Sequence, residues 1–318
     1  MIKNKEYWFH PFQVGEHKPF VRIQPHFICD EQQLPEEIQN RLNHISETDF
    51  WQRPSETLLL TQKEKFIDSV NRVKTWIKNK RLEKMALSVL REAILPSEFS
   101  ILKTLHTLRS LYPQTFISYI STPYTGTWLG ATPEILLHQH QQQGETVSLA
   151  GTKLLHEKRD WGEKERIEQD IVTRFINEEI SSVIHGTIKQ EGPYTLAIGN
   201  LLHLQTKFRF DFNVVPDVKE ILQLALRLHP TPAVGAYPKQ MANIIQDVEL
   251  HDRLYYAGFT GPVDTQASHL FVNLRCLMLV NDSAYIYSGA GITADSNPED
   301  EWLETENKAL SIQHAFKP

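Results

Sequence analysis

Two glutamates and one lysine near the carboxyl-terminal end of the sequence have the spacing of one helix face. Glu301, Glu304 and Lys308 are separated by three and four positions within a stretch of helical periodicity. Side chains at these offsets return to the same side of a helix, so two carboxylates and one ammonium group should point in one direction. Such a cluster could bind a metal ion or an anionic ligand, although a solvated helix face would show the same spacing.

A second pair of glutamates with this spacing lies in the middle of the chain. Glu165 and Glu168 fall in a helical stretch over residues 161–184, and Val172 and Phe175 continue the helix face that Glu168 begins. These acids therefore lie at the edge of a buried stripe rather than on the wet side of the helix. Two helices that each carry Glu-x-x-Glu, with no Cys or His cluster, favour a hard cation such as Mg²⁺, which prefers oxygen ligands.

The composition restricts the classes of partner. The 318 residues are 41% hydrophobic, which is enough for a large core. A net charge of −6 without a basic cluster argues against nucleic acid as a partner. No apolar stretch approaches membrane-spanning length and no signal peptide is visible, so we expect a cytoplasmic protein without membrane association. Cys29 and Cys276 lack metal-binding spacing and fit a reducing compartment.

The elements that must position these residues alternate between helical and strand-like patterns. Periodicity predicts helices over 62–79, 97–112, 161–184 and from 297, and strands over 85–94, 115–121, 127–137, 146–150, 270–280 and 284–288. Ser296 and Glu299 have the spacing of a capping box at the start of the last helix. Neighbouring strands with helices between them predict an α+β fold with large antiparallel or mixed sheets and helices outside. We expect residues 1–60 to be integrated with one domain over residues 61–318.

Eight segments of the chain occur together in a recognisable order. They are KMALSVLRE, which starts at Lys84, LGATPEILL, SLAGT, the HL at 203, HPTPAVGAYP, RLYYAGFTGPVD, NLRCLM and SGAGITADSNPEDEWLETENK. Together they resemble the chorismate-utilising enzymes, a superfamily that includes isochorismate, salicylate, anthranilate and aminodeoxychorismate synthases. The resemblance covers about residues 60–312 and implies that family's α+β fold, with chorismate as the substrate. Residues 1–60 resemble the family's variable amino-terminal region only loosely.

The resemblance implies a reaction and the residues that carry it out. Chorismate is a dianion that loses its C4 hydroxyl while a nucleophile adds at C2, so a proton donor must lie beside C4 and a base near C2. By the matching motifs, Lys84 takes the position of the base and Glu134 that of the acid. The base must be neutral and the acid protonated near neutral pH, and burial favours both uncharged forms. Without the resemblance, a surface lysine and a strand-edge acid would be the simpler interpretation.

The glutamate pairs match the metal-binding positions of the family. Glu168 and Glu304 resemble direct Mg²⁺ ligands, which would hold the ring carboxylate of the substrate and polarise it for loss of the C4 hydroxyl. Glu165 and Glu301 resemble an outer pair that acts through water or by positioning. The resemblance therefore implies Mg²⁺ as the cofactor.

Further positions match residues that bind the substrate in the family. They are Gly151, Thr152, His203, Ala233, Tyr256, Arg275, Gly289, Gly291 and Lys308. Arg275 and Tyr256 are expected to bind the enolpyruvyl carboxylate, and the glycines to bring backbone N–H groups close to a carboxylate. His203 is expected to lie against the ring near the point of nucleophile delivery, although a lone histidine is more often structural.

Two positions distinguish members of the family. The segment HPTPA, which ends at Ala233, resembles isochorismate synthases, in which water attacks, and Ala150 stands where aminodeoxychorismate synthases often carry a lysine. The resemblance thus indicates an isochorismate synthase of the menaquinone or siderophore type, without a glutamine amidotransferase subunit. Two alternatives remain, namely a salicylate- or anthranilate-type synthase that releases pyruvate and a chorismate-binding protein without turnover. Gln169, where the family usually has histidine, and Lys153 after AGT depart from the pattern.

Overall fold

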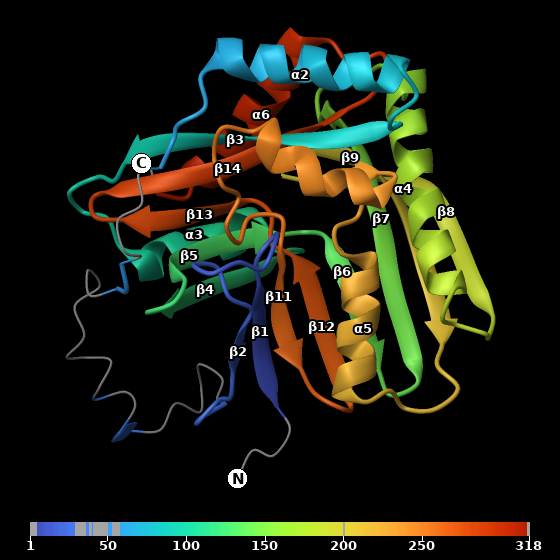
Figure 1. Ribbon diagram of the computed structural model, residues 1–318. Coiled ribbons are helices and arrows are strands. Elements are labelled where there is room, and N and C mark those ends of the chain that lie inside the picture. Colours follow the sequence, from blue (N-terminus) through green and yellow to red (C-terminus); the bar gives the residue numbers. More distant parts are fainter. Residues whose placement is uncertain are drawn as a thin grey trace.

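Two antiparallel β-sheets and the helices that cover them make up the architecture (Figure 1). The structure, a computed structural model, describes residues 5–28, 36–37, 40, 50–52, 58–199 and 201–316. The α+β class is confirmed. Cys29 lies outside the described residues, and Cys276 is buried. No helix in the described ranges is long and apolar enough to cross a membrane.

The larger sheet has eight strands and the smaller has six. In spatial order the larger sheet contains β2 (Val21–Ile23), β1 (Glu6–His10), β11 (Phe259–Val263), β12 (Ala267–Val272), β6 (Ile135–His140), β7 (Gln143–Leu154), β9 (Leu201–Asp211) and β8 (Ile188–Ile198). The smaller sheet contains β10 (Ala236–Tyr237), β3 (Lys84–Ile94), β14 (Ser283–Ile292), β13 (Cys276–Val280), β5 (Gly126–Thr132) and β4 (Phe116–Thr122). Strands distant in sequence are therefore neighbours in each sheet.

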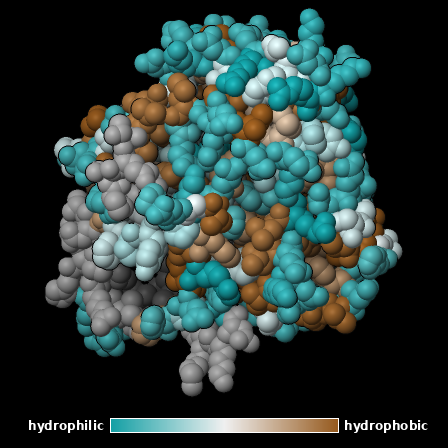
Figure 2. Space-filling view, in the orientation of Figure 1, coloured by the Kyte–Doolittle hydropathy of each residue, from teal (hydrophilic) through white to brown (hydrophobic). Residues whose placement is uncertain are grey.

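Helices cover the sheets through their apolar faces. They are α2 (Lys63–Lys78), α3 (Ile101–Leu111), α4 (Glu163–Ser181), α5 (Val218–Leu228), α6 (Pro298–Gln313) and the 3-10 helix η1 (Lys239–Asp247). Helices α2 and α6 lie along the smaller sheet, and α4 packs on β7 and β9 of the larger sheet (Figure 1). In α2, Phe66, Val70 and Val73 are buried, while the outward side of this helix is largely hydrophilic (Figure 2). These helices carry the glutamate pairs to the region where the two sheets meet.

Two of the predicted strands are wrong because each of them contains a change of sheet. The stretch predicted as one strand over 127–137 is divided at Pro133 and Glu134, so that β5 belongs to the smaller sheet and β6 to the larger. The stretch predicted over 270–280 is divided in the same way at 273–275, where Arg275 has a positive φ of 46°. Proline has no N–H for a ladder, and a positive φ breaks extended backbone. Apolar residues lie on both sides of each break, so the sequence pattern resembles one continuous strand.

The ends of several helices and strands differ from the predictions. Helix α6 begins at Pro298, and the side chain of Asn297 accepts hydrogen bonds from the N–H groups of Glu299 and Asp300. The predicted capping box is therefore wrong, since the Ser296 hydroxyl instead accepts a hydrogen bond from the Thr293 N–H. Helix α3 starts at Ile101 rather than at 97, and β7 is longer than the predicted 146–150. Asparagine caps a helix as well as serine does, so neighbouring candidates could not be separated from the sequence.

Strand β1 joins the first described residues to the core. It pairs with β11, and its Trp8 and Phe9 side chains are fully buried. The Phe9 ring stacks on Tyr255 at 4.2 Å and meets Trp128 of β5 edge-on. Strand β1 thus belongs to the same sheet as strands from the later part of the chain. The division of the chain at residue 60 remains a prediction.

Replacing Phe9 by alanine should destabilise the whole fold. We expect Phe9→Ala to lower the free energy of unfolding by about 3–5 kcal/mol, because a buried aromatic ring is lost and a cavity remains. Urea unfolding should show a lower midpoint with an unchanged slope. Phe27→Ala is the control, since Phe27 is 55% exposed, and it should change the stability by less than about 0.5 kcal/mol. Equal effects of the two substitutions would contradict this account of β1.

Candidate active site

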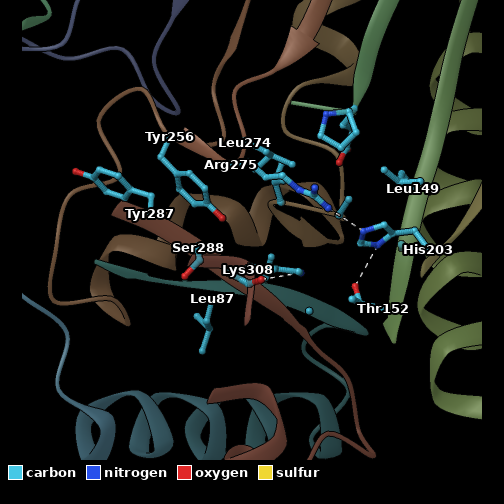
Figure 3. Close-up of a pocket in the computed structure, with 18 of the residues that line it drawn as sticks. Leu87, Leu149, Thr152, His203, Tyr256, Leu274, Arg275, Tyr287, Ser288 and Lys308 are labelled. Carbon is cyan, nitrogen blue, oxygen red and sulfur yellow. Dashed lines mark hydrogen bonds between the residues drawn. The ribbon is translucent and has the colours of Figure 1, made fainter. Parts of the chain in front are cut away.

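A pocket lies where the two sheets meet the helices α4 and α6 (Figure 3). Most of the residues predicted for the site line it, namely Glu134, Gly151, Thr152, Glu168, His203, Ala233, Tyr256, Arg275, Gly289, Gly291 and Lys308. The sequence analysis did not single out Leu149, Leu274, Tyr287 and Ser288, which also line the pocket. Their sequence signal is that each of them lies within two positions of a predicted site residue. The fold thus brings together predicted site residues from both sheets and from the helices α4 and α6.

Lys84 and Glu168 form a buried ion pair beside this pocket. Lys84 is the first residue of β3 and is 0% exposed, and its Nζ lies 3.0 Å from Glu168 Oε1. The contact is an ion pair rather than a well-aligned hydrogen bond. Burial acts to raise the pKa of Glu168, but Lys84, Lys164 and Lys308 outweigh it and lower that pKa. Glu168 is therefore a carboxylate that holds the Lys84 ammonium in place.

Gly291 of β14 leaves the room that this ion pair needs. A Cβ atom at this position would collide with Glu168 Oε1 and would lie 2.8 Å from Lys84 Cε. Neither group can retreat far, because Lys84 is enclosed and Glu168 is fixed to a packed helix. The glycine was predicted to let backbone approach a carboxylate, and here the carboxylate it admits is that of Glu168.

Glu134 lies at the crossing from β5 to β6, with its side chain almost completely buried. It is 4% exposed, and burial raises the pKa of its carboxyl to about 7 against the opposing charges of Lys84 and Lys308. A carboxyl group with this pKa carries its proton for much of the time near neutral pH. A buried carboxyl group that can hold a proton therefore lies at this position, and its role as proton donor stays a prediction.

His203 and Arg275 meet across the pocket (Figure 3). Arg275 Nη2 lies 3.3 Å from His203 Nε2, and His203 Nδ1 lies 3.3 Å from both Thr152 Oγ1 and the Gly151 carbonyl. A guanidinium can only donate, so Nε2 is the acceptor and Nδ1 carries the hydrogen. Burial, then the charges of Arg275 and Lys308, lower the pKa of His203 well below its usual value. The imidazole is therefore neutral.

Arg275, which lines the pocket, has one donor without a partner among the described residues. Its Nη1 is buried and has no hydrogen-bond partner among the described residues, and the guanidinium lies over the Tyr112 ring at 5.6 Å. Burial lowers the pKa of Arg275 to about 10, which leaves it charged at neutral pH. A buried charged donor without a partner is costly, so it favours an acceptor such as a ligand carboxylate.

Lys308 of α6 adds a second positive group on the opposite wall. Its Nζ donates to the Gly289 carbonyl at 2.9 Å and to Glu304 Oε1 at 2.7 Å. A Cβ atom at Gly289 would lie 2.8 Å from the Tyr256 hydroxyl, so this glycine gives the tyrosine its place. Burial raises the pKa of Tyr256, which keeps its hydroxyl as a neutral donor.

The remaining carboxylates predicted as metal ligands lie beside the pocket on α4 and α6. Glu165 Oε1 accepts from Arg159 Nη2 at 2.8 Å, and Glu301 accepts a short hydrogen bond from Lys164. Glu301 is 1% exposed, and burial followed by the charge of Glu304 raises its pKa to about 7. As the side chains stand, no three His, Cys, Asp or Glu groups in the described ranges converge to hold a metal ion. Each carboxylate instead faces a basic partner.

Two buried polar groups that the sequence analysis gave no role stabilise the walls of the site. Arg253, which lines the pocket, donates to Glu249, to the Val234 carbonyl and to the Ala86 carbonyl. Gln169 donates to Ser148 at the back of the site. The motif RLYYAG contains Arg253, and its partner Glu249 lies four positions earlier, but that spacing indicates an ion pair only on a helix and this segment is not helical.

Comparison with known proteins agrees with this architecture. The chain belongs to the chorismate binding enzyme family, whose profile matches residues 6–317. Isochorismate synthase EntC of Escherichia coli K12 is 29% identical over 251 residues, which cover 74% of this chain and 63% of EntC. Anthranilate synthase component 1 of Geobacillus stearothermophilus is 27% identical over 280 residues, covering 80% of this chain and 52% of that protein. This chain thus spans less than two thirds of these relatives.

A solved structure shares the fold. The crystal structure of DhbC from Bacillus anthracis superposes with a TM-score of 0.80 at 24% sequence identity, and the match covers 98% of this chain and 83% of that one. At this identity the likeness establishes the architecture of the two sheets, while the chemistry must be argued from the site itself.

The raised pKa of Glu134 predicts a pH-dependent gain in stability when the carboxyl is removed. The folded protein binds this proton more tightly than the unfolded chain, so the contribution of Glu134 to stability is lost as pH rises from about 4.5 to about 7. Glu134→Gln cannot ionise and should raise the free energy of unfolding by up to about 3 kcal/mol at pH 8 while changing it little near pH 4. Urea unfolding without added metal or substrate measures both values. The control is Glu98→Gln at an exposed site, and an equal effect of Glu134→Gln at both pH values would refute the buried-acid assignment.

Proposed function

We propose that the protein is an isochorismate synthase, which converts chorismate to isochorismate by addition of water at C2 and loss of the C4 hydroxyl. The observation that carries this proposal is the meeting of a buried acid, Glu134, and a buried amine, Lys84, in one site with the free guanidinium donor of Arg275. The family membership of the chain supports chorismate as the ligand. The product would serve menaquinone or siderophore synthesis.

The acid and the base have different tasks in this reaction. Hydroxide is a poor leaving group, so Glu134 would protonate the C4 oxygen as the bond breaks, and its pKa of about 7 suits this task. Water is a poor nucleophile, so Lys84 would take a proton from the water that attacks C2. Lys84 is paired with Glu168 at 3.0 Å, and it must give up its own proton before it can accept another.

The anionic groups of the substrate would be held by the positive walls of the pocket. Arg275, with its unpartnered Nη1, and the Tyr256 hydroxyl would bind one carboxylate. Lys308 would contribute charge near the other, since its Nζ already lies at the edge of the pocket. A neutral His203, held by Thr152 and Arg275, would lie against the ring without adding charge.

Glutamates of α4 and α6 fit Mg²⁺ through the chemistry of their donor set. Four carboxylates lie on the two helices at matching spacing, and the ammonium group of Lys164, which pairs with Glu301, stands in as a cation between the helices. Glu168 and Glu304 would hold the ion, with Glu165 and Glu301 as the outer pair. When bound, Mg²⁺ would neutralise the ring carboxylate of the substrate and polarise it for loss of the C4 hydroxyl.

The alternative function within the family is a synthase that aminates the ring or releases pyruvate. The similarity to anthranilate synthase component 1 keeps this class in view. In the pocket, however, Ala150 stands beside Gly151 where aminodeoxychorismate synthases often carry a nucleophilic lysine, and Ala233 of the HPTPA segment, which resembles isochorismate synthases, also lines the pocket. These small apolar side chains favour water as the only nucleophile and make an amidotransferase subunit unnecessary.

The product of chorismate decides between these functions. Incubation of the protein with chorismate and Mg²⁺, followed by NMR, should show isochorismate without pyruvate, and added ammonium should not change the product. The same mixture with excess EDTA should show no turnover until Mg²⁺ is restored, because the proposed ion neutralises the ring carboxylate of the substrate for loss of the C4 hydroxyl. Salicylate or anthranilate with pyruvate would establish the alternative, and tight chorismate binding without product would identify a binding protein.

Substitution of the acid or the base should abolish most of the turnover. Lys84→Ala and Glu134→Gln should each lower kcat by about 10²–10⁴-fold, the usual loss for a positioned proton-transfer group, with chorismate binding largely retained. The effects should not add, because departure and attack belong to one displacement. Starting from isochorismate should give the same losses with the two roles exchanged. Lys103→Ala at an exposed position is the control, and near-normal kcat for Lys84→Ala would leave His203 as the next candidate base.

A further inference from the structure

The four glutamates assigned to the metal are matched one to one with basic side chains of the protein. The pairs are Glu165 with Arg159, Glu168 with Lys84, Glu301 with Lys164 and Glu304 with Lys308. Buried carboxylates without counter-charges would be strongly destabilising, so these cations make the metal-free fold possible. A divalent ion that enters this site must therefore replace existing ionic partners.

Lys164 differs from the other three cations in having no second task. Lys308 lines the substrate pocket, Lys84 is the proposed base beside it, and Arg159 also bonds Glu157. Lys164 lies in the first turn of α4 and reaches across to Glu301 of α6, which joins the two metal-binding helices. Because Lys164 does not line the substrate pocket, its ammonium can leave without disturbing a group that contacts substrate.

The surroundings of Lys164 are strongly negative on the inner side. Burial alone would lower its pKa, but the charges of Glu301, Glu304 and Glu168 outweigh burial and raise it. Three carboxylates assigned to the metal therefore act on one ammonium group. An ammonium and Mg²⁺ cannot both occupy the space between these oxygens, because each needs the same lone pairs and like charges repel at short distance.

The side chain has somewhere to go when it leaves. Lys164 is partly exposed and also lines a depression on the surface, whose wall contains Glu83 and Asp295. Glu83 already pairs with Arg174 at 2.7 Å, so rotation about the flexible four-carbon stem of Lys164 would carry its ammonium from the buried carboxylates toward solvent and the exposed Asp295. The exchange would keep the lysine charged in both positions.

We propose that Lys164 is a built-in competitor of the divalent metal, which occupies the carboxylate cluster in the metal-free protein and swings outward when the ion binds. The inference rests on the proposed function, since it takes Glu168, Glu301 and Glu304 as metal-binding residues. Lys164 would then set the affinity for the metal without contacting either the metal or the substrate. The metal would then bind weakly until it is joined by an anionic substrate.

Direct metal binding tests this inference without reliance on activity. Mn²⁺ binding to the full-length protein, followed by the EPR signal of the free ion at about pH 8 without chorismate, gives the dissociation constant. Lys164→Met should bind Mn²⁺ about tenfold more tightly than the wild type, because one unit of like charge is removed a few ångströms from the ion.

Two further variants separate competition from other effects. Lys164→Arg keeps the positive charge and should stay within about twofold of the wild type, since the competing cation remains. Lys63→Met removes a lysine from an exposed pair with Glu299 at the start of α6 and should also leave Mn²⁺ affinity unchanged. Should Lys164→Met unfold, the arginine variant still gives a test. If Lys164→Arg binds Mn²⁺ more than about twofold more weakly than the wild type, Lys164 only positions Glu301 and the inference is wrong.

The outcomes are distinct for the inference and for the proposed function. Tighter binding by Lys164→Met alone supports competition. If the wild type binds Mn²⁺ and Lys164→Met binds it equally or more weakly, the inference is overturned and the magnesium-dependent function still stands. Absence of Mn²⁺ binding by every variant and by the wild type, with or without chorismate, overturns the metal site and the inference together.

Discussion

The two bends at which strands pass from one sheet to the other hold the site together. Glu134 and Arg275 lie at these bends, and backbone hydrogen bonds join the bends to each other, from the Val272 N–H to the Glu134 carbonyl at 2.9 Å and from the Ala131 N–H to the Arg275 carbonyl at 3.0 Å. The amide of Asn273 adds a hydrogen bond to the Tyr255 carbonyl at 2.9 Å. One hydrogen-bonded unit thus fixes the acid, the guanidinium and the loop that carries Tyr256, and a shift in any of them would move the others.

Charge balance is the second constraint, because the site buries many ionised groups in a small volume. Arg253 and Glu249 are both enclosed, and their ion pair also binds the Ala86 carbonyl and the Ser88 N–H of β3 and the Val234 carbonyl. A buried pair of this kind contributes little net stability compared with apolar packing, but loss of one partner is severe. Its effect here is positional, since it ties the strand that begins at Lys84 to the loop after Ala233. The buried ion pair therefore fixes the positions of β3 and the loop after Ala233 and adds little to the stability of the fold.

The sequence predicted which residues line the pocket more accurately than it predicted where the strands begin and end. Glu301, Glu304 and Lys308 could be grouped because helical periodicity is local, and the family resemblance supplied Lys84, Glu134 and Arg275 directly. Pro133 is a signal against one continuous strand, whereas the break at 273–275 has no such residue, and the apolar residues on either side of it suit a strand in either sheet. Which sheet a strand joins depends on partners far away in the chain. The pairing of Lys164 with Glu301 likewise depends on how α4 and α6 pack, which no single segment encodes.

Gln169 shows how a departure from the family pattern can leave the site intact. Its amide nitrogen donates to the Ser148 hydroxyl at 2.8 Å on β7 and to Thr206 Oγ1 at 3.1 Å on β9. These bonds hold α4 against two strands one residue away from Glu168, so the carboxylate is positioned by the amide. A neutral histidine has one N–H to donate, whereas the two hydrogens of a glutamine amide can serve both strands. The substitution therefore changes the means by which α4 is anchored and keeps the carboxylate that faces Lys84 where the chemistry needs it.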